Sequence, residues 1–229
     1  MSIEWKPGPN LALVGNSSLS ALIDPRGNVV WTCLPRFDSD PVFDALLKGA
    51  TLPDDGFYLV DLYDFDHSEQ GYLTNTAVVR TRLFDTRGGI IDVLDFAPRF
   101  HQHGRTFRPL TFVRLLRPVS GSPRVRVLLR PTSALGGSPP GITWGSNHIR
   151  YVLPHVTLRL TTDASITALL DETAFVVERP LTLILGPDET LPSGIAETGH
   201  RFLEETVSHW QEWVRYLGIP FEWQEAVIR

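Results

Sequence analysis

Short β-forming runs separated by turn residues, at intervals of roughly 8–12 positions, dominate the chain from residue 11 to residue 185. No long helical pattern lies between these runs, which excludes a parallel sheet with crossover helices. The pattern therefore predicts an all-β fold. We expect a large antiparallel β-sandwich followed by a C-terminal linker helix.

Turn chemistry marks the boundaries of the expected strands. The turn residues at 24–28, 85–89 and 120–123 contain Pro or Gly between two apolar runs. Between residues 124 and 130, Val125, Val127 and Leu129 alternate with polar residues, which is typical of a half-buried antiparallel strand. The expected strands are 18–23, 29–33, 77–84, 90–96, 110–117, 124–130, 148–152, 156–161, 174–178 and 181–185.

The periodicity changes from strand to helix after about residue 186. Apolar residues recur at spacings of three and four along residues 199–217, which predicts one apolar face of a helix. Glu204, Glu205, Glu212 and Arg215 fall on other faces, and Gly218 with Pro220 ends the pattern. The apolar positions are Leu203, Val207, Trp210, Val214 and Leu217.

A second helical pattern opens at Phe221 and runs to Arg229 without a stop signal. A helix this short does not hold itself together in water, because isolated helices need about 12–15 residues. We therefore expect three segments: a β-super-sandwich domain at 1–195, a linker helix at 196–219, and the start of a further domain at 220–229.

Charge and cysteine content exclude several classes of protein. The net charge of −5 gives no reason to expect nucleic acid or an anionic membrane as a partner. The single Cys33 excludes an intramolecular disulfide and a cysteine-based zinc site, and we expect it to be a buried strand thiol. No apolar targeting segment opens the chain, and no apolar run approaches the roughly 20 residues of a membrane span. We expect a soluble, cytoplasmic protein.

Seven motifs, in order along essentially the whole chain, resemble bacterial proteins of glycoside hydrolase family 15, the glucoamylase and trehalase-like group. Each motif alone is weakly specific, and their shared order carries the resemblance. They are LVGN at 13–16 with SALID at 20–24, WTCLPRFDSDPVF at 31–43, YLTNTA at 72–77, VLDFAPR at 93–99, GSNHIRY at 145–151, LGPDETL at 185–191 and PFEWQEAVIR at 220–229.

The resemblance implies a specific architecture and role. Family members join an N-terminal super-sandwich, through a linker helix, to an (α/α)6 barrel that carries the two glutamates of an inverting glycosidase. Neither glutamate has a counterpart in this chain, so the resemblance implies a domain that is inactive alone, within an α-glucoside hydrolase. It implies the barrel as partner, a trehalose-type or other α-glucoside as the sugar of the full enzyme, and no cofactor or metal. Which α-glucoside is cleaved stays open. A stand-alone carbohydrate-binding module and an interaction module are the alternatives.

The loop that follows the expected strand 29–33 is the first candidate for a functional site. Pro35, Arg36, Phe37 and Asp38 place a rigid ring, a forked cation, an aromatic face and a carboxylate side by side. Aromatic faces and charged hydrogen-bonding groups suit sugars, so one interpretation is that the loop helps to shape a sugar pocket. The other is that an Arg36–Asp38 pair only holds the loop or an interdomain contact.

Residues 99–108 form a basic and aromatic segment that we expect to be a long loop contacting the barrel, with Arg99 as a candidate contact. His101 and His103 lack a third ligand at useful spacing, so we expect no metal site. The acidic net charge argues against nucleic acid.

Aromatic residues gather near the C-terminal end of the chain. Trp210, Trp213 and Trp223, with Phe221, either pack the helix against the sandwich or bury against the barrel. In the second case part of the cluster is exposed in this chain, and we expect self-association.

Other constellations predict no catalytic residue in this chain. We expect no catalytic dyad from the paired carboxylates Asp54-Asp55, Asp64/Asp66 and Glu204-Glu205. No nucleophile elbow surrounds Ser17-Ser18 or Ser133. No phosphate-binding helix follows Gly136-Gly137.

Overall fold

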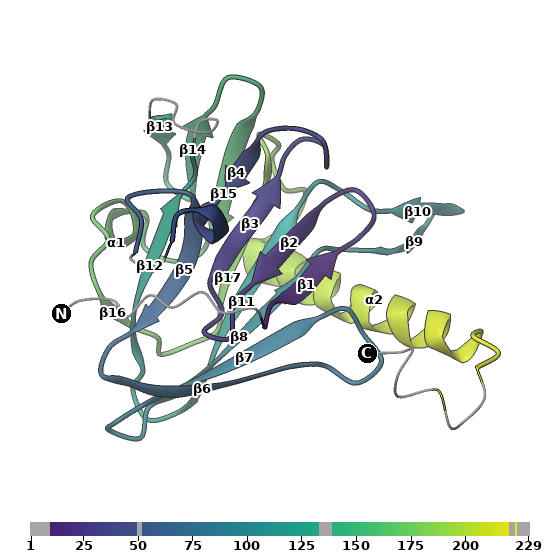
Figure 1. Ribbon diagram of the computed structural model, residues 1–229, viewed down its shortest axis with the longest axis horizontal. Coiled ribbons are helices and arrows are strands. Elements are labelled where there is room, and N and C mark those ends of the chain that lie inside the picture. Colours follow the sequence, from purple (N-terminus) through teal and green to yellow (C-terminus); the bar gives the residue numbers. More distant parts are fainter. Residues whose placement is uncertain (1–9, 50–51, 133–138, 220–222, 224–229) are drawn as a thin grey trace.

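The computed structural model describes residues 10–49, 52–132, 139–219 and Trp223. Within these residues, seventeen strands form a seven-stranded sheet, an eight-stranded sheet and a two-stranded hairpin, all antiparallel (Figure 1). The prediction of an all-β sandwich with a C-terminal helix is confirmed.

The seven-stranded sheet has the order β1-β2-β3-β5-β12-β16, with β4 paired to β3. The β2–β3 hairpin was predicted from its turn residues and is confirmed. The strands are β1 (Ala12–Gly15), β2 (Ser20–Ile23), β3 (Val29–Cys33), β4 (Pro41–Phe43), β5 (Phe57–Leu62), β12 (Arg124–Arg130) and β16 (Phe175–Val176).

The eight-stranded sheet has the order β13-β14-β15-β17-β11-β8-β7-β6, and β9 (Phe100–Gln102) pairs with β10 (Arg105–Phe107) outside it. The predicted hairpin of β7 and β8 is confirmed. The strands of the large sheet are β6 (Phe65–Tyr72), β7 (Val79–Asp85), β8 (Ile90–Phe96), β11 (Phe112–Ser120), β13 (Gly141–Trp144), β14 (His148–Val152), β15 (Thr157–Thr162) and β17 (Leu181–Pro187).

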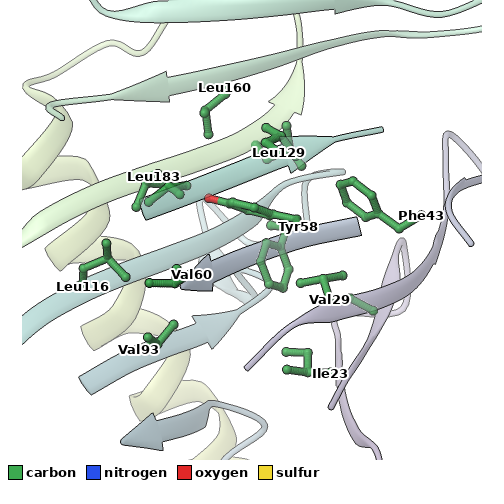
Figure 2. Packing of buried hydrophobic residues seen from close by; sticks show 14 of the residues in the cluster. Ile23, Val29, Phe43, Tyr58, Val60, Val93, Leu116, Leu129, Leu160 and Leu183 are labelled. Carbon is green, nitrogen blue, oxygen red and sulfur yellow. The ribbon is translucent and has the colours of Figure 1, made fainter. Parts of the chain in front are cut away.

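The main core lies between the inner faces of the two sheets. Figure 2 shows Tyr58 and Val60 of β5 facing Val93, Leu116 and Leu183 of the opposite sheet, all fully or almost fully buried. Burying such side chains contributes about 1.5–3 kcal/mol each before entropy is counted. The alternation of Val125, Val127 and Leu129 in β12 predicts this face correctly.

The outer faces of both sheets are covered as well. Val30, Phe57 and Leu59 lie under the 3-10 helix η1 (Ala45–Leu47) on the seven-stranded sheet. Helix α2 (Ile195–Arg215) lies along the eight-stranded sheet (Figure 1). Its Phe202 and Leu203 pack on the outer face of that sheet. Strands that are buried on both faces read as continuous apolar runs rather than alternating ones, which explains the FYLVDL sequence of β5.

One buried ion pair crosses the interior of the sandwich. Arg114 of β11 donates from Nε and Nη2 to the carboxylate of Asp95 on β8, at 2.7 and 2.9 Å, and both side chains are 0% exposed. The same guanidinium donates to two carbonyl oxygens of the seven-stranded sheet: that of Gly27 in the β2–β3 turn, at 2.7 Å, and that of Tyr58 on β5, at 3.2 Å. It also lies 4.4 Å from the centre of the Tyr58 ring. Arg114 therefore joins the two sheets through polar contacts.

The predicted helix is present, and its observed end differs more than its start. Helix α2 begins at Ile195, one residue before the predicted segment 196–219, and ends at Arg215, four residues before the end of that segment. Gly199 lies inside the helix, where a Cβ atom would come within 2.5 Å of Thr182 Cγ2 on β17. The absence of a side chain at Gly199 therefore allows the helix to lie close against β17.

Three other details differ from the predictions. The turn at 120–123 does not close a hairpin, because β11 and β12 belong to different sheets. The run 174–178 forms only the two-residue β16. The strands β4, β5, β6, β9, β10 and β13 and the short helix α1 (Ile166–Leu170) were not predicted. Apart from Trp223, the predicted segment 220–229 lies outside the described residues, as do Ser133, Gly136 and Gly137.

The edges of the two sheets are tied together by Tyr72. Its hydroxyl accepts a hydrogen bond from the Leu13 amide at 2.8 Å and donates to the Leu13 carbonyl at 2.9 Å. Leu13 lies on the edge strand β1 and Tyr72 on the edge strand β6. One side chain thus satisfies both backbone groups of an edge residue, which reduces the capacity of β1 to pair with another chain.

Candidate functional site

The predicted loop after β3 is held by its own ion pair. Arg36 donates from Nε and Nη2 to the two carboxylate oxygens of Asp38, at 2.8 and 2.9 Å. This bidentate contact lowers the pKa of Asp38 and raises that of Arg36 from their ordinary values. The loop backbone closes through the Ser39 amide and the Arg36 carbonyl at 3.1 Å, and the Leu34–Pro35 peptide bond is cis.

The same loop lines an open pocket of about 530 Å³. Phe37 is 55% exposed and presents its ring to solvent. The pocket brings together an aromatic face, a guanidinium, a carboxylate and the residues Ser17 and Ser18. The aromatic face suits a sugar ring, and the polar groups suit its hydroxyls. The lining residues are Ser17, Ser18, Pro35, Arg36, Phe37, Asp38 and Leu110.

The buried side chain of Asn16 positions Ser17 and Ser18, the two serines that line the pocket. Its Nδ2 donates to the carbonyls of Pro98 and Pro109, at 2.9 and 2.8 Å. Its Oδ1 accepts from the amides of Ser18 and Leu19, at 2.9 and 3.1 Å. This side chain therefore fixes the turn between β1 and β2 against two distant segments, and it holds Ser17 in the left-handed region at φ 70°.

Arg99 connects that turn to helix α2. Its Nη1 donates to the Asn16 carbonyl at 2.7 Å and to Ser17 Oγ at 2.8 Å, and its Nε donates to His209 Nε2 at 3.1 Å. The guanidinium also lies 5.7 Å from the Trp210 ring centre. Arg99, predicted as a contact to another domain, is therefore engaged in contacts within this chain.

The basic segment 99–108 is a hairpin, not the long loop that was predicted. β9 and β10 pair with each other, and the rings of Phe100 and Phe107 pack against each other and against Phe202 of α2. The available signal for a hairpin is Gly104, which together with His103 forms a two-residue turn at φ 73° and 50° between the paired strands. His101 contacts His209, with ring centres 5.3 Å apart, and no group of three potential metal ligands occurs among the described residues.

Aromatic side chains at the end of α2 remain open to solvent. Trp210 is partly buried and contacts Trp213 edge to face, with ring centres 5.8 Å apart. Trp213 is 48% exposed, and Tyr216 is 88% exposed. Trp223 is also exposed. The helix therefore packs through its first half and leaves aromatic surface at its end.

Ser17 brings the two predicted groups of site residues onto one surface. It lines the pocket with Arg36, Phe37 and Asp38, and its hydroxyl accepts from Arg99, which in turn contacts Trp210. We call this region the Ser17 surface, and it comprises Ser17, Ser18, Pro35, Arg36, Phe37, Asp38, Arg99, Trp210 and Trp213. The sequence prediction missed Ser17, His209 and Tyr216 as members or neighbours of it.

Other sequence candidates remain apart from this surface. Asp66 pairs with His67, Asp64 with Arg87, and Glu204 with His200, in each case on an exposed part of the structure. Cys33 is half-buried rather than fully buried. No described helix is both long and apolar enough to cross a membrane.

Comparison with known proteins gives two matches. A family model described as "Trehalase-like, N-terminal" matches residues 5–159. The chain is also 32% identical over 92 residues to Trehalase 2 of Sulfolobus acidocaldarius, a match that covers 39% of this chain but only 14% of that protein. Among solved structures, none matches the chain. Because the family model spans more than half of the sequence, the chain belongs to the trehalase-like N-terminal domain family.

Proposed function

We propose that this chain is the non-catalytic N-terminal domain of a trehalase-like glycoside hydrolase, and that it docks on the catalytic domain through the Ser17 surface. The observation that carries the proposal is the continuity of this surface. A sugar-compatible pocket at Arg36–Asp38 and an aromatic patch at Trp213 are joined by Ser17 and Arg99. Protein interfaces are enriched in Trp and Arg, and this surface exposes Trp213 and Arg36.

The pocket loop has a second role in the proposal. Arg36 and Asp38 remain accessible although they bind each other, with 75% and 70% of their side chains exposed. A catalytic domain seated on the Ser17 surface covers this pocket and brings Phe37 close to bound sugar. The loop thus shapes the sugar pocket of the assembled enzyme, whose substrate we propose to be trehalose or a related α-glucoside.

Kinetics of the complete enzyme test the pocket. Arg36→Ala is expected to raise KM or lower kcat for the α-glucoside, because it removes a positioned donor and frees Asp38. Arg87→Ala is the matched control, since Arg87 also forms an exposed ion pair, with Asp64, away from the pocket. Unchanged KM and kcat in the Arg36→Ala and Asp38→Ala variants would show that this loop does not shape the sugar pocket.

Affinity for the separately produced catalytic domain tests docking. Trp213→Ser is expected to weaken the complex by at least about tenfold, which is typical for truncating a buried interface tryptophan. Trp144→Ser is the control, because Trp144 is at least as exposed, 62% against 48% for Trp213, but lies on the edge strand β13. Equal affinities of the two variants would contradict docking through this surface.

The isolated chain separates this proposal from a stand-alone carbohydrate-binding module. A stand-alone carbohydrate-binding module binds glycans by itself, whereas a domain that docks on a partner exposes the apolar surface that the partner normally covers. We expect hydrophobic-dye binding and self-association, both reduced by Trp213→Ser. Tight glycan binding by the isolated chain, with no dye binding, would favour the module.

A further inference from the structure

His209 lies where the end of helix α2 meets the segment before hairpin β9–β10. Its Nε2 is 3.1 Å from Arg99 Nε, and its ring centre is 5.3 Å from that of His101. On the helix it neighbours Trp210, whose ring centre is 5.5 Å away. This imidazole is therefore a polar contact between the last turns of α2 and Arg99. The Arg99 guanidinium also lies 5.7 Å from the Trp210 ring centre, and Gln211 Nε2 donates to the Thr74 carbonyl at 3.5 Å.

The chemistry of the donor fixes the state of the imidazole. A guanidinium carries only donors and stays charged at all physiological pH values, so the Arg99 Nε–H must donate in this contact. His209 Nε2 must then be the acceptor, which requires the neutral ring with its proton on Nδ1. If Nε2 were protonated, two N–H groups and two positive charges would face each other.

The surroundings of His209 oppose its protonation. Burial, the positive charge of Arg99 and the neighbouring His101 lower the pKa of His209, in that order, while Glu212 one turn further along the helix acts in the other direction. Glu212 is exposed, so solvent screens its charge. These are the charged and titratable groups that act on this imidazole from α2, β9 and the segment before β9.

We propose that protonation of His209 is a switch that releases the last turns of α2 from Arg99. The contacts of the preceding turns do not titrate in this range. The Arg99 amide donates to Thr206 Oγ1 at 3.2 Å, and Phe202 remains packed on Phe100. The released part is therefore confined to residues 209–215, which include Trp210 and Trp213 of the Ser17 surface.

The consequence for docking rests on the proposed function above, whereas the switch itself does not. Trp210 and Trp213 are held in place at neutral pH because their helical turn is fixed to Arg99, and Arg99 is fixed to Ser17. In acid this turn separates from Ser17 and the Ser17 surface loses its shape. Association with a catalytic domain is then weaker in acid than at neutral pH.

The direction of the pH dependence follows from proton linkage. A histidine whose pKa is lower in the folded state binds protons more readily when released. The contact is therefore fully formed above the ordinary histidine value of about 6.5. It is lost as the pH falls from that value through the folded-state value.

Imidazole ¹⁵N NMR and amide hydrogen exchange on this chain test the switch. At about pH 7.5, His209 should show a protonated Nδ1 and an unprotonated Nε2, and it should titrate below the ordinary range. Amides 209–215 should exchange about tenfold faster at about pH 5.5, after correction for intrinsic rates, as expected for losing one hydrogen bond to a charged group. Amides 199–205 serve as the internal reference and should not change.

Two histidine variants on the same helix decide the assignment. His209→Gln keeps an acceptor for Arg99 at every pH and should abolish the pH dependence. His200→Gln removes an exposed imidazole that pairs with Glu204 and should leave the dependence intact. A protonated Nε2 at neutral pH, or an unchanged pH dependence in His209→Gln, overturns the proposal. If Trp213→Ser leaves docking unaffected while the exchange result holds, the docking proposal fails and the switch stands.

Discussion

Removing Asp95 tests whether the buried Arg114–Asp95 pair holds the two sheets together. Asp95→Ala leaves the Arg114 guanidinium fully buried with only the carbonyls of Gly27 and Tyr58 as acceptors. Breaking a buried ion pair by deleting one partner costs about 3–5 kcal/mol, because the remaining charge is neither solvated nor neutralised. That is a large fraction of the roughly 5–15 kcal/mol that stabilises a typical domain.

Asp92 on the same strand provides the matched control. It binds Arg82 with the same bidentate geometry, at 2.6 and 2.8 Å, but both side chains are partly exposed, 28% for Arg82 and 14% for Asp92. An ion pair that solvent reaches contributes about 0.2–1 kcal/mol. The two substitutions remove the same chemical group and differ in burial.

Urea unfolding followed by circular dichroism measures the difference. With a slope of about 2–3 kcal/mol per molar urea, Asp95→Ala should lower the unfolding midpoint by about 1.5 M and Asp92→Ala by less than about 0.5 M. If Asp95→Ala does not fold, Asp95→Asn and Asp92→Asn replace the pair of variants and the same order is expected. Equal midpoints for the two positions would refute the argument that burial determines the cost.

Three further substitutions have defined outcomes in the same unfolding assay. Tyr58→Phe removes a buried hydroxyl that has no hydrogen-bond partner among the described residues, so stability should rise by about 1 kcal/mol; a loss would mean that the hydroxyl has a partner. Tyr72→Phe should cost about 1 kcal/mol and speed exchange of the Leu13 amide, and unchanged exchange would contradict the edge contact. Gly199→Ala should destabilise by about 1–3 kcal/mol although alanine favours helices, because its Cβ would meet Thr182 Cγ2, and Thr182→Ser should relieve the clash; a more stable Gly199→Ala variant would show that the helix moves freely.

The strands that could be predicted from the sequence are those with one clear signal. In β12, Val125, Val127 and Leu129 alternate and face the core, so their pattern reports burial directly. In β6, the sequence FDHSEQGY carries almost no apolar signal, because an edge strand needs only backbone pairing with β7 and side chains that tolerate water. Propensity and periodicity do not detect a strand of that kind.

The candidate site shows a similar limit. Arg36, Phe37 and Asp38 are adjacent in sequence, so their proximity needed no fold to predict it. Ser17 joins them to Arg99 only because the buried Asn16 side chain connects segments 82 and 93 residues away in the chain. Long-range side-chain contacts of this kind leave no periodic trace, and a single sequence does not reveal them.

Helix α2 lies close against β17 at Gly199 and carries Trp213 near its other end. From that close approach on β17 to Trp213 the helix extends about 21 Å, at 1.5 Å per residue. A rotation of the helix axis by about 5° about Gly199 would displace Trp213 by about 2 Å over that length. If part of the clash in Gly199→Ala were relieved by such a tilt, the substitution would also displace Trp213, which lies near the other end of the helix. The lack of a side chain at position 199 therefore bears on where the exposed Trp213 is presented as well as on stability.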